Sequence, residues 1–152
     1  MRKSVIKRIL RYYSLYAALN NFIAHFILLF TRIWIGNIYL KSGLTKISVW
    51  DQTLILFEYE YEVPFLPVEL AAIMSTAAEL ICPILLFVGI FSRLSILPLF
   101  IMTIIIELFI IQNVHHLYWL FMMAVIMGFG SGRISIDGFL AQRLDRKSTR
   151  LN

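Results

Sequence analysis

The stretch that decides the fold runs from Val68 to Ile90 and reads VELAAIMSTAAELICPILLFVGI. Its apolar residues form a continuous block, whereas a helix on the surface of a soluble protein alternates apolar and polar positions. A helix rises about 1.5 Å per residue, so about 20 apolar residues cross the ~30 Å hydrocarbon layer of a membrane. The stretch therefore predicts a transmembrane helix.

Three further apolar blocks predict membrane spans over residues 21–44, 94–112 and 115–131. Of the 152 residues, 60% are hydrophobic and 15% are charged, which is too apolar for the water-exposed surface of one small soluble domain. We therefore expect an all-α integral membrane protein whose domain, residues 21–140, is a four-transmembrane-helix bundle in contact with the lipid bilayer.

Loop charges predict the orientation of the bundle. Residues 1–20, the turn at Arg93 and residues 141–152 are basic, whereas the segment between the first two spans is acidic. Because basic loops stay in the cytoplasm, both termini are predicted to be cytoplasmic. The start is expected to be a basic interfacial segment, and the tail from Lys147 is expected to be disordered. On the outer face, residues 53–61 predict a short helical lid that Pro64 and Pro67 end before the second span.

Several function classes are not expected. The basic residues at the two ends indicate topology, so no nucleic-acid partner is predicted. Cys82 is the single cysteine, which rules out an internal disulfide. The histidines (His25, His115, His116) fall near opposite faces of the membrane and cannot complete one ligand set, so we expect no metal and no haem or other covalently bound cofactor.

Charged side chains inside the predicted spans mark candidate sites, because burying a charge in a bilayer is costly. Arg32, Tyr39 and Lys46 share one stripe of the first span, and Glu79 lies deep in the second. Counting from the outer span ends gives Arg32 and Glu79 similar depths, so we predict an ion pair between them. This pair could fix helix packing, or Glu79 could bind a polar headgroup or handle a proton.

A second polar group is predicted nearer the outer face. Glu107 of the third span is expected to meet Tyr39, Lys46 and His115 beneath the aromatic lid, with His116 as the adjacent alternative. Such a pocket could exchange protons with a quinone-like ring, because histidine titrates near neutral pH. At the cytoplasmic surface, Arg93 and Asp137 are predicted to pair and to fasten the two inner loops.

Five ordered motifs resemble the DoxX family of bacterial membrane proteins. They are Arg32-x3-Gly36, Ser42-Gly43-Leu44-x-Lys46, Glu79, Gly89-x2-Ser92-Arg93 and Gly128-x-Gly130-x3-Ile134-Ser135-Ile136-Asp137. The resemblance covers about Ile33 to Leu140. It implies a four-span protein of the bacterial inner membrane linked to quinol oxidase or thiosulfate:quinone oxidoreduction. It also implies that Lys46, Glu79, Arg93 and Asp137 form the family's polar signature.

Two functions follow as expectations. The first is a redox-associated subunit that binds quinone or quinol and acts with a partner oxidoreductase, which would carry the electrons because this chain has no evident catalytic centre of its own. The second is a non-catalytic membrane scaffold or a small-molecule permease in which the same charges fix helix packing. Whether the chain is an enzyme stays open at this point.

Overall fold

The computed structural model describes residues 2–61, 66–110 and 112–151, with side chains from residue 6 to residue 144 within these ranges. The chain forms helices in this order: α1 (Arg2–Ser48), α2 (Trp50–Leu56), the π-helix η1 (Phe57–Tyr61), α3 (Val68–Val88), α4 (Ser92–Phe109), α5 (Val114–Phe129) and α6 (Ile136–Leu151). The described ranges contain no β-strand, which confirms the predicted all-α class.

The helices have the length and surface of a membrane protein. Three of them, α1, α3 and α4, are long and apolar enough to cross a bilayer, and α5 is an apolar helix of 16 residues. Large apolar side chains face outward, among them Phe109, Phe121 and Phe129, which are 80%, 71% and 75% exposed. Exposing such a surface to water is unfavourable in free energy, whereas exposing it to lipid chains is not. The chain is therefore a multi-pass membrane protein.

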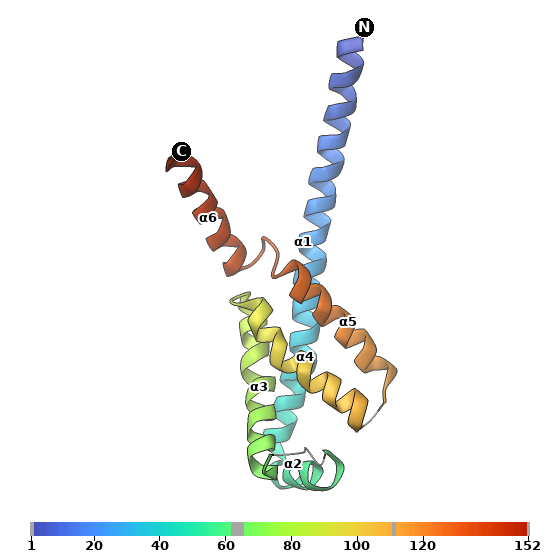
Figure 1. Ribbon diagram of the computed structural model, residues 1–152, viewed down its shortest axis with the longest axis vertical. Helices are drawn as coiled ribbons and strands as arrows, with labels where there is room; N and C mark the ends of the chain where they lie inside the picture. The colour runs from blue at the N-terminus through green and yellow to red at the C-terminus, as the bar shows by residue number, and fades with distance from the viewer. Residues whose placement is uncertain (1, 62–65, 111, 152) are drawn as a thin grey trace.

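The bundle is built around the contact between α1 and α3 (Figure 1). Glycines on α1 let the two helices approach: an added Cβ at Gly43 would lie 3.0 Å from Glu79 Cβ, and one at Gly36 would lie 2.5 Å from the Phe87 ring. Helix α4 packs against α3 and α5, and α5 also contacts α1. The shared core contains Ile35, Tyr39, Cys82, Leu86, Ile96, Leu99, Met123 and Ile126.

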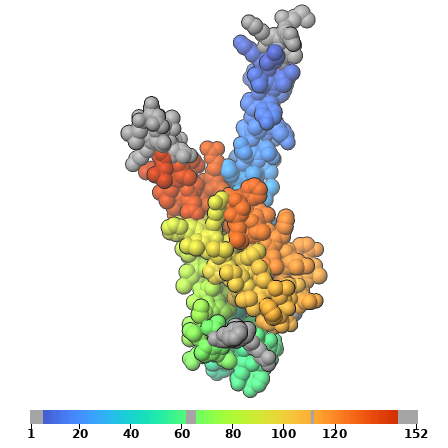
Figure 2. Space-filling model, viewed as in Figure 1, coloured from blue at the N-terminus to red at the C-terminus, as the bar shows by residue number. Residues whose placement is uncertain are grey.

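Helix α1 differs most from the prediction. It continues without a break past residue 20 and ends at Ser48 rather than at residue 44. Helix α6 continues to Leu151, so the expectation of a disordered tail from Lys147 is wrong. The N-terminal part of α1 and α6 project from the same end of the bundle, called the basic end below because Lys7, Arg8, Arg11 and Arg143 lie on them (Figures 1 and 2).

A short helical segment closes the opposite end of the bundle, as expected for the lid. Helix α2 and η1 together form this lid, and Phe57 packs against Ala71 and Ala72 of α3. Pro67 occupies the residue before α3, whereas Pro64 lies outside the described residues. The other end of α3 stops at Gly89, whose φ of 72° is the left-handed conformation that glycine adopts at helix ends.

Candidate functional site

The centre of the candidate site is an ion pair between α1 and α3. Lys46 Nζ lies 2.7 Å from Glu79 Oε1 and also donates to Ser75 Oγ at 3.2 Å. The side chains of Lys46 and Glu79 are only 9% and 3% exposed. The second carboxylate oxygen, Glu79 Oε2, has no hydrogen bond within the described residues. The pair therefore offers a buried acceptor beside a buried cation.

The predicted partner of Glu79 was wrong. Arg32 is 1% exposed, but its Nη2 donates to the carbonyl of Ile134 at 2.6 Å, and its Nη1 atom occupies the space beside Gly89. The prediction matched the outer ends of the spans at Leu44 and Val68, whereas in the structure Gly43 packs against Glu79. Because α3 extends beyond the end of α1, Arg32 belongs to the basic end, where the partial negative charge at the C-terminus of α3 favours a cation.

A cavity of about 170 Å³ lies beside the Lys46–Glu79 pair and is called the polar chamber below, because these two charged side chains line it. Four residues singled out from the sequence line it: Tyr39, Lys46, Glu79 and His116. The chamber is also lined by four residues that the sequence did not assign to the site: Ser42, Tyr61, Thr103 and Trp119. Thr103 and Trp119 lie inside apolar stretches and Tyr61 lies between two glutamates, so only the helix register shows that these side chains face one space. Tyr39 and Thr103 share a hydrogen bond inside the chamber.

Glu107 reaches the chamber only through a histidine. Its Oε2 lies 2.9 Å from His116 Nδ1 and also accepts the backbone N–H of Asn113 at 3.0 Å. His116 in turn stacks beside Trp119, with ring centroids 5.2 Å apart. His115 is exposed and lines no part of the chamber, so the expected meeting of Glu107 with His115 is wrong and the adjacent His116 takes that place.

The lid lies at the end of the bundle opposite the basic end (Figure 1) and reaches the chamber through Tyr61. Thr53 Oγ1 donates to the carbonyl of Lys46 at 3.0 Å, and the Phe57 ring centroid lies 5.5 Å from Lys46 Nζ. Burial raises the pKa of the Tyr61 hydroxyl, with a smaller contribution from the negative charge of Glu79, so Tyr61 remains a neutral donor. Tyr61 belongs to η1, and short π-helical turns are frequent at functional sites.

An apolar hollow of about 250 Å³ adjoins the polar chamber between α3 and α4. Tyr61, Met102 and Ile106 line both spaces. The remaining wall is almost entirely apolar, and Ser75, the hydroxyl partner of Lys46, lies on it. A molecule with a polar head and an apolar chain would find both environments side by side.

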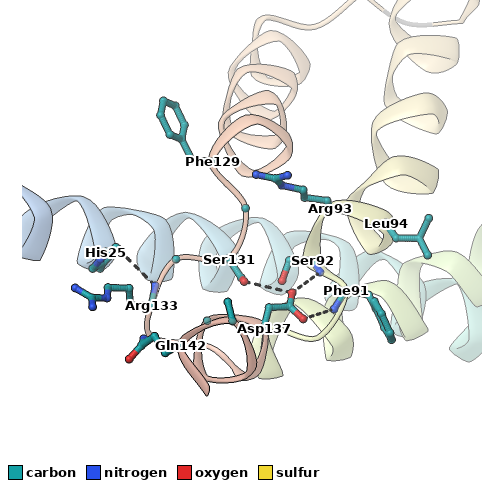
Figure 3. Close-up of a pocket in the computed structure, with 14 residues that line it drawn as sticks. His25, Phe91, Ser92, Arg93, Leu94, Phe129, Ser131, Arg133, Asp137 and Gln142 are labelled. Carbon is teal, nitrogen blue, oxygen red and sulfur yellow. Dashed lines mark hydrogen bonds between the residues drawn. The ribbon is translucent and has the colours of Figure 1, made fainter. Parts of the chain in front are cut away.

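At the basic end, Arg93 and Asp137 fasten the chain separately rather than as a pair, so the predicted Arg93–Asp137 contact is wrong. Asp137 accepts the backbone N–H groups of Phe91 at 3.0 Å and Ser92 at 3.1 Å (Figure 3). Arg93 Nη2 donates to the carbonyl of Gly128 at 3.1 Å. Backbone donors at the start of α4 outcompete the guanidinium because they already point at the carboxylate.

Within the described residues, no group of three or more histidine, cysteine, aspartate or glutamate side chains could hold a metal ion. The apolar helices and the charges buried between them define a multi-pass helical membrane protein. Residues 27–112 match the sequence profile of the DoxX family, and the chain belongs to that family. The matched region contains Lys46, Glu79 and Arg93. Comparisons with curated proteins and with solved structures gave no significant match.

Proposed function

We propose that this DoxX-family protein binds a quinone or quinol in the polar chamber and acts with a partner oxidoreductase. The observation that carries the proposal is the buried Lys46–Glu79 pair, which lines one cavity with Tyr39 and His116. Charges at membrane depth are costly and are retained mainly where they have a use. A quinone ring carries two oxygens, which Lys46 and Tyr39 can approach as donors.

The chamber suits the proton steps of quinol chemistry. Oxidation of a quinol to a quinone releases two electrons and two protons. The electrons pass to an acceptor cofactor in the partner subunit, and the protons pass to bases near the ring. Glu79 and His116 are the bases that line the chamber, and Glu107 orients His116 through its 2.9 Å contact.

The apolar hollow supports a ligand with a long hydrocarbon tail. Its wall between α3 and α4 continues from the chamber through Met102 and Ile106, so a ring among the polar groups would leave its tail in this hollow. Apolar burial contributes about 25 cal/mol per Å², which makes a membrane-soluble amphiphile a better occupant than a small polar solute. This favours quinone binding over a permease for polar molecules.

The membrane arrangement is part of the proposal. We propose that α5 is a fourth span, so that both termini lie on one side, and that the basic residues at that end keep it on the cytoplasmic side of a bacterial plasma membrane. The lid and the chamber beneath it then lie toward the outer leaflet. A quinol oxidised there would release its protons on the outer side.

The proposal is tested by extracting the lipids that co-purify with the protein in mild detergent and identifying them by mass spectrometry. Quinone is expected with the wild type and with Lys41→Gln, a control at an exposed lysine of α1 that does not line the chamber. Glu79→Gln, unlike a change to an apolar residue, keeps an oxygen that can accept a hydrogen bond from Lys46 Nζ, so it should remain folded and lose most of the quinone. If all three proteins carry the same amount of quinone, or none, the charges serve helix packing and the scaffold function replaces this one.

A further inference from the structure

The basic end of the bundle contains a second hollow, which the proposed function does not use. It measures about 640 Å³ and lies between α1, the turn from α3 to α4 and the segment from α5 to α6 (Figure 3). Three basic side chains from different parts of the chain line it: His25 of α1, Arg93 of α4 and Arg133 before α6. Groups so far apart in the sequence make a cationic site only because the fold brings them to one place.

The one carboxylate in this lining is already occupied. Asp137 accepts Phe91 N–H, Ser92 N–H and the Ser131 hydroxyl, at 3.0, 3.1 and 3.3 Å. These donors hold the carboxylate against the turn (Figure 3). With Arg93 and Arg133 against one aspartate, the lining is positive even when His25 is neutral. The hollow is therefore suited to an anion.

A buried hydroxyl in the same lining lacks a partner. Ser92 is 1% exposed, and its Oγ forms no hydrogen bond within the described residues. A buried polar group without a partner is destabilising by about 1–3 kcal/mol, so such groups usually meet a ligand or water. The Ser92 hydroxyl thus lies just behind the wall of the cationic hollow, with no accessible surface of its own in it.

Two glycines keep the cationic groups uncovered. An added Cβ at Gly130 would lie 3.3 Å from Arg93 Nε, and one at Gly132 would lie 3.5 Å from His25 Nδ1. Both glycines have left-handed backbone φ angles, 74° and 73°, which residues other than glycine rarely adopt. The sequence Gly130-Ser131-Gly132 therefore shapes an open anion-accepting wall rather than merely ending α5.

The rim of the hollow is apolar and exposed. Phe91, Leu94 and Phe129 are 68%, 65% and 75% exposed, and they sit where the apolar helices α3, α4 and α5 begin or end. Lipid headgroups lie at this depth, directly beside such side chains. A free phosphate ion would gain nothing from this rim, whereas a phospholipid would place its acyl chains against it.

We propose that this hollow is a binding site for the phosphate headgroup of an anionic phospholipid, held by Arg93 and Arg133. Basic pockets between membrane helices bind anionic headgroups through the same combination of charge and apolar flank. The occupied site would fix the turn from α3 to α4 against the segment before α6. It does not depend on quinone binding.

The test measures lipid affinity of the delipidated full chain in neutral detergent, by titration with phosphatidylglycerol, phosphatidylcholine or inorganic phosphate. Phosphatidylglycerol should bind more tightly than phosphatidylcholine, and Arg133→Gln should weaken its binding about fivefold. Arg133 is the first choice because, within the described residues, only its backbone N–H is bonded, at 3.5 Å from His25 Nδ1.

The matched control is Arg143→Gln, which removes an arginine of α6 that stacks 4.4 Å from the Phe139 ring and does not line the hollow. This variant should bind phosphatidylglycerol as the wild type does. An equal loss in Arg143→Gln, or equal affinity for the two lipids, overturns the proposal in favour of nonspecific charge attraction. Equally tight binding of inorganic phosphate overturns the assignment to a lipid.

Discussion

Lys46 and Glu79 form a 2.7 Å ion pair that joins the last turns of α1 to the middle of α3. Thr53 of the lid contacts neither charged group but donates a hydrogen bond to the Lys46 carbonyl. The ion pair, the end of α1 and the lid are therefore connected. The pair is therefore both a packing contact and the polar wall of the chamber.

Removing one member of this pair should destabilise the protein far more than removing both. Lys46→Met or Glu79→Leu alone leaves a buried charge unpaired and is expected to cost about 3–5 kcal/mol of unfolding free energy. The double variant leaves no charge and should unfold close to the wild type. Denaturation in mixed detergent micelles measures the free energy of unfolding of the wild type, the two single variants and the double variant. Additive losses in the double variant would show that the two side chains act independently.

The close approach of α1 and α3 at Gly43 gives a second prediction. An added Cβ there would lie 3.0 Å from Glu79 Cβ, so Gly43→Ala should separate the helices and destabilise the protein by about 1–3 kcal/mol. Gly128 is the matched control, because an added Cβ there meets nothing within 4 Å. Gly128→Ala should leave thermal stability unchanged or slightly raised. Equal losses at both glycines would contradict the packing account.

Adjacent histidines should behave differently. His116 lies 2.9 Å from Glu107 and beside Trp119, whereas His115 is exposed. His116→Gln should therefore lower stability by roughly 1–2 kcal/mol, because it weakens a charge-assisted contact between α4 and α5. His115→Gln should have no measurable effect on the melting temperature in detergent. The reverse order of effects would mean that the chamber wall is assigned to the wrong histidine.

Asp137 should be important for stability at the basic end. Asp137→Ala removes the acceptor for Phe91 N–H, Ser92 N–H and the Ser131 hydroxyl and is expected to cost about 2 kcal/mol. Phe91 holds a left-handed φ of 47°, which is unfavourable for a bulky residue without such an anchor. Faster hydrogen exchange at the backbone amides of Phe91 and Ser92 is expected once their hydrogen bonds to Asp137 are lost. Asp51→Asn, at an exposed position of α2, should leave that exchange unchanged.

The sequence predicted the helical membrane class because blocks of apolar residues such as 68–90 have no other stable arrangement. It also predicted that Tyr39, Lys46, Glu79 and one of the adjacent histidines are site residues, because polar groups in apolar blocks are conspicuous. It failed on the partner of Glu79, since pairing depends on how far α3 extends past α1. The apolar sequences alone do not show that Gly43 faces Glu79, and this register places Arg32 beside Gly89 at the basic end rather than at the depth of Glu79.

The sequence also did not predict which residues bound the chamber. Thr103 and Trp119 line the chamber because of the rotation of α4 and α5 about their own axes, which an apolar sequence leaves undetermined. The separate roles of Arg93 and Asp137 depend on backbone N–H groups of the turn at Phe91. Such backbone donors are present at every residue, so their use at one turn cannot be recognised without the structure.

The most direct test of the central claim is a titration of Trp119 fluorescence with a short-chain quinone. Trp119 lines the chamber with its ring centroid 6.1 Å from Tyr39, so a bound quinone should quench it. Replacing Trp34 and Trp50 by Phe leaves Trp119 as the single tryptophan. We predict saturable quenching that becomes at least about tenfold weaker when Lys46→Met and Glu79→Leu are combined. Quenching that rises without saturation, and equally in both proteins, would contradict quinone binding in the chamber.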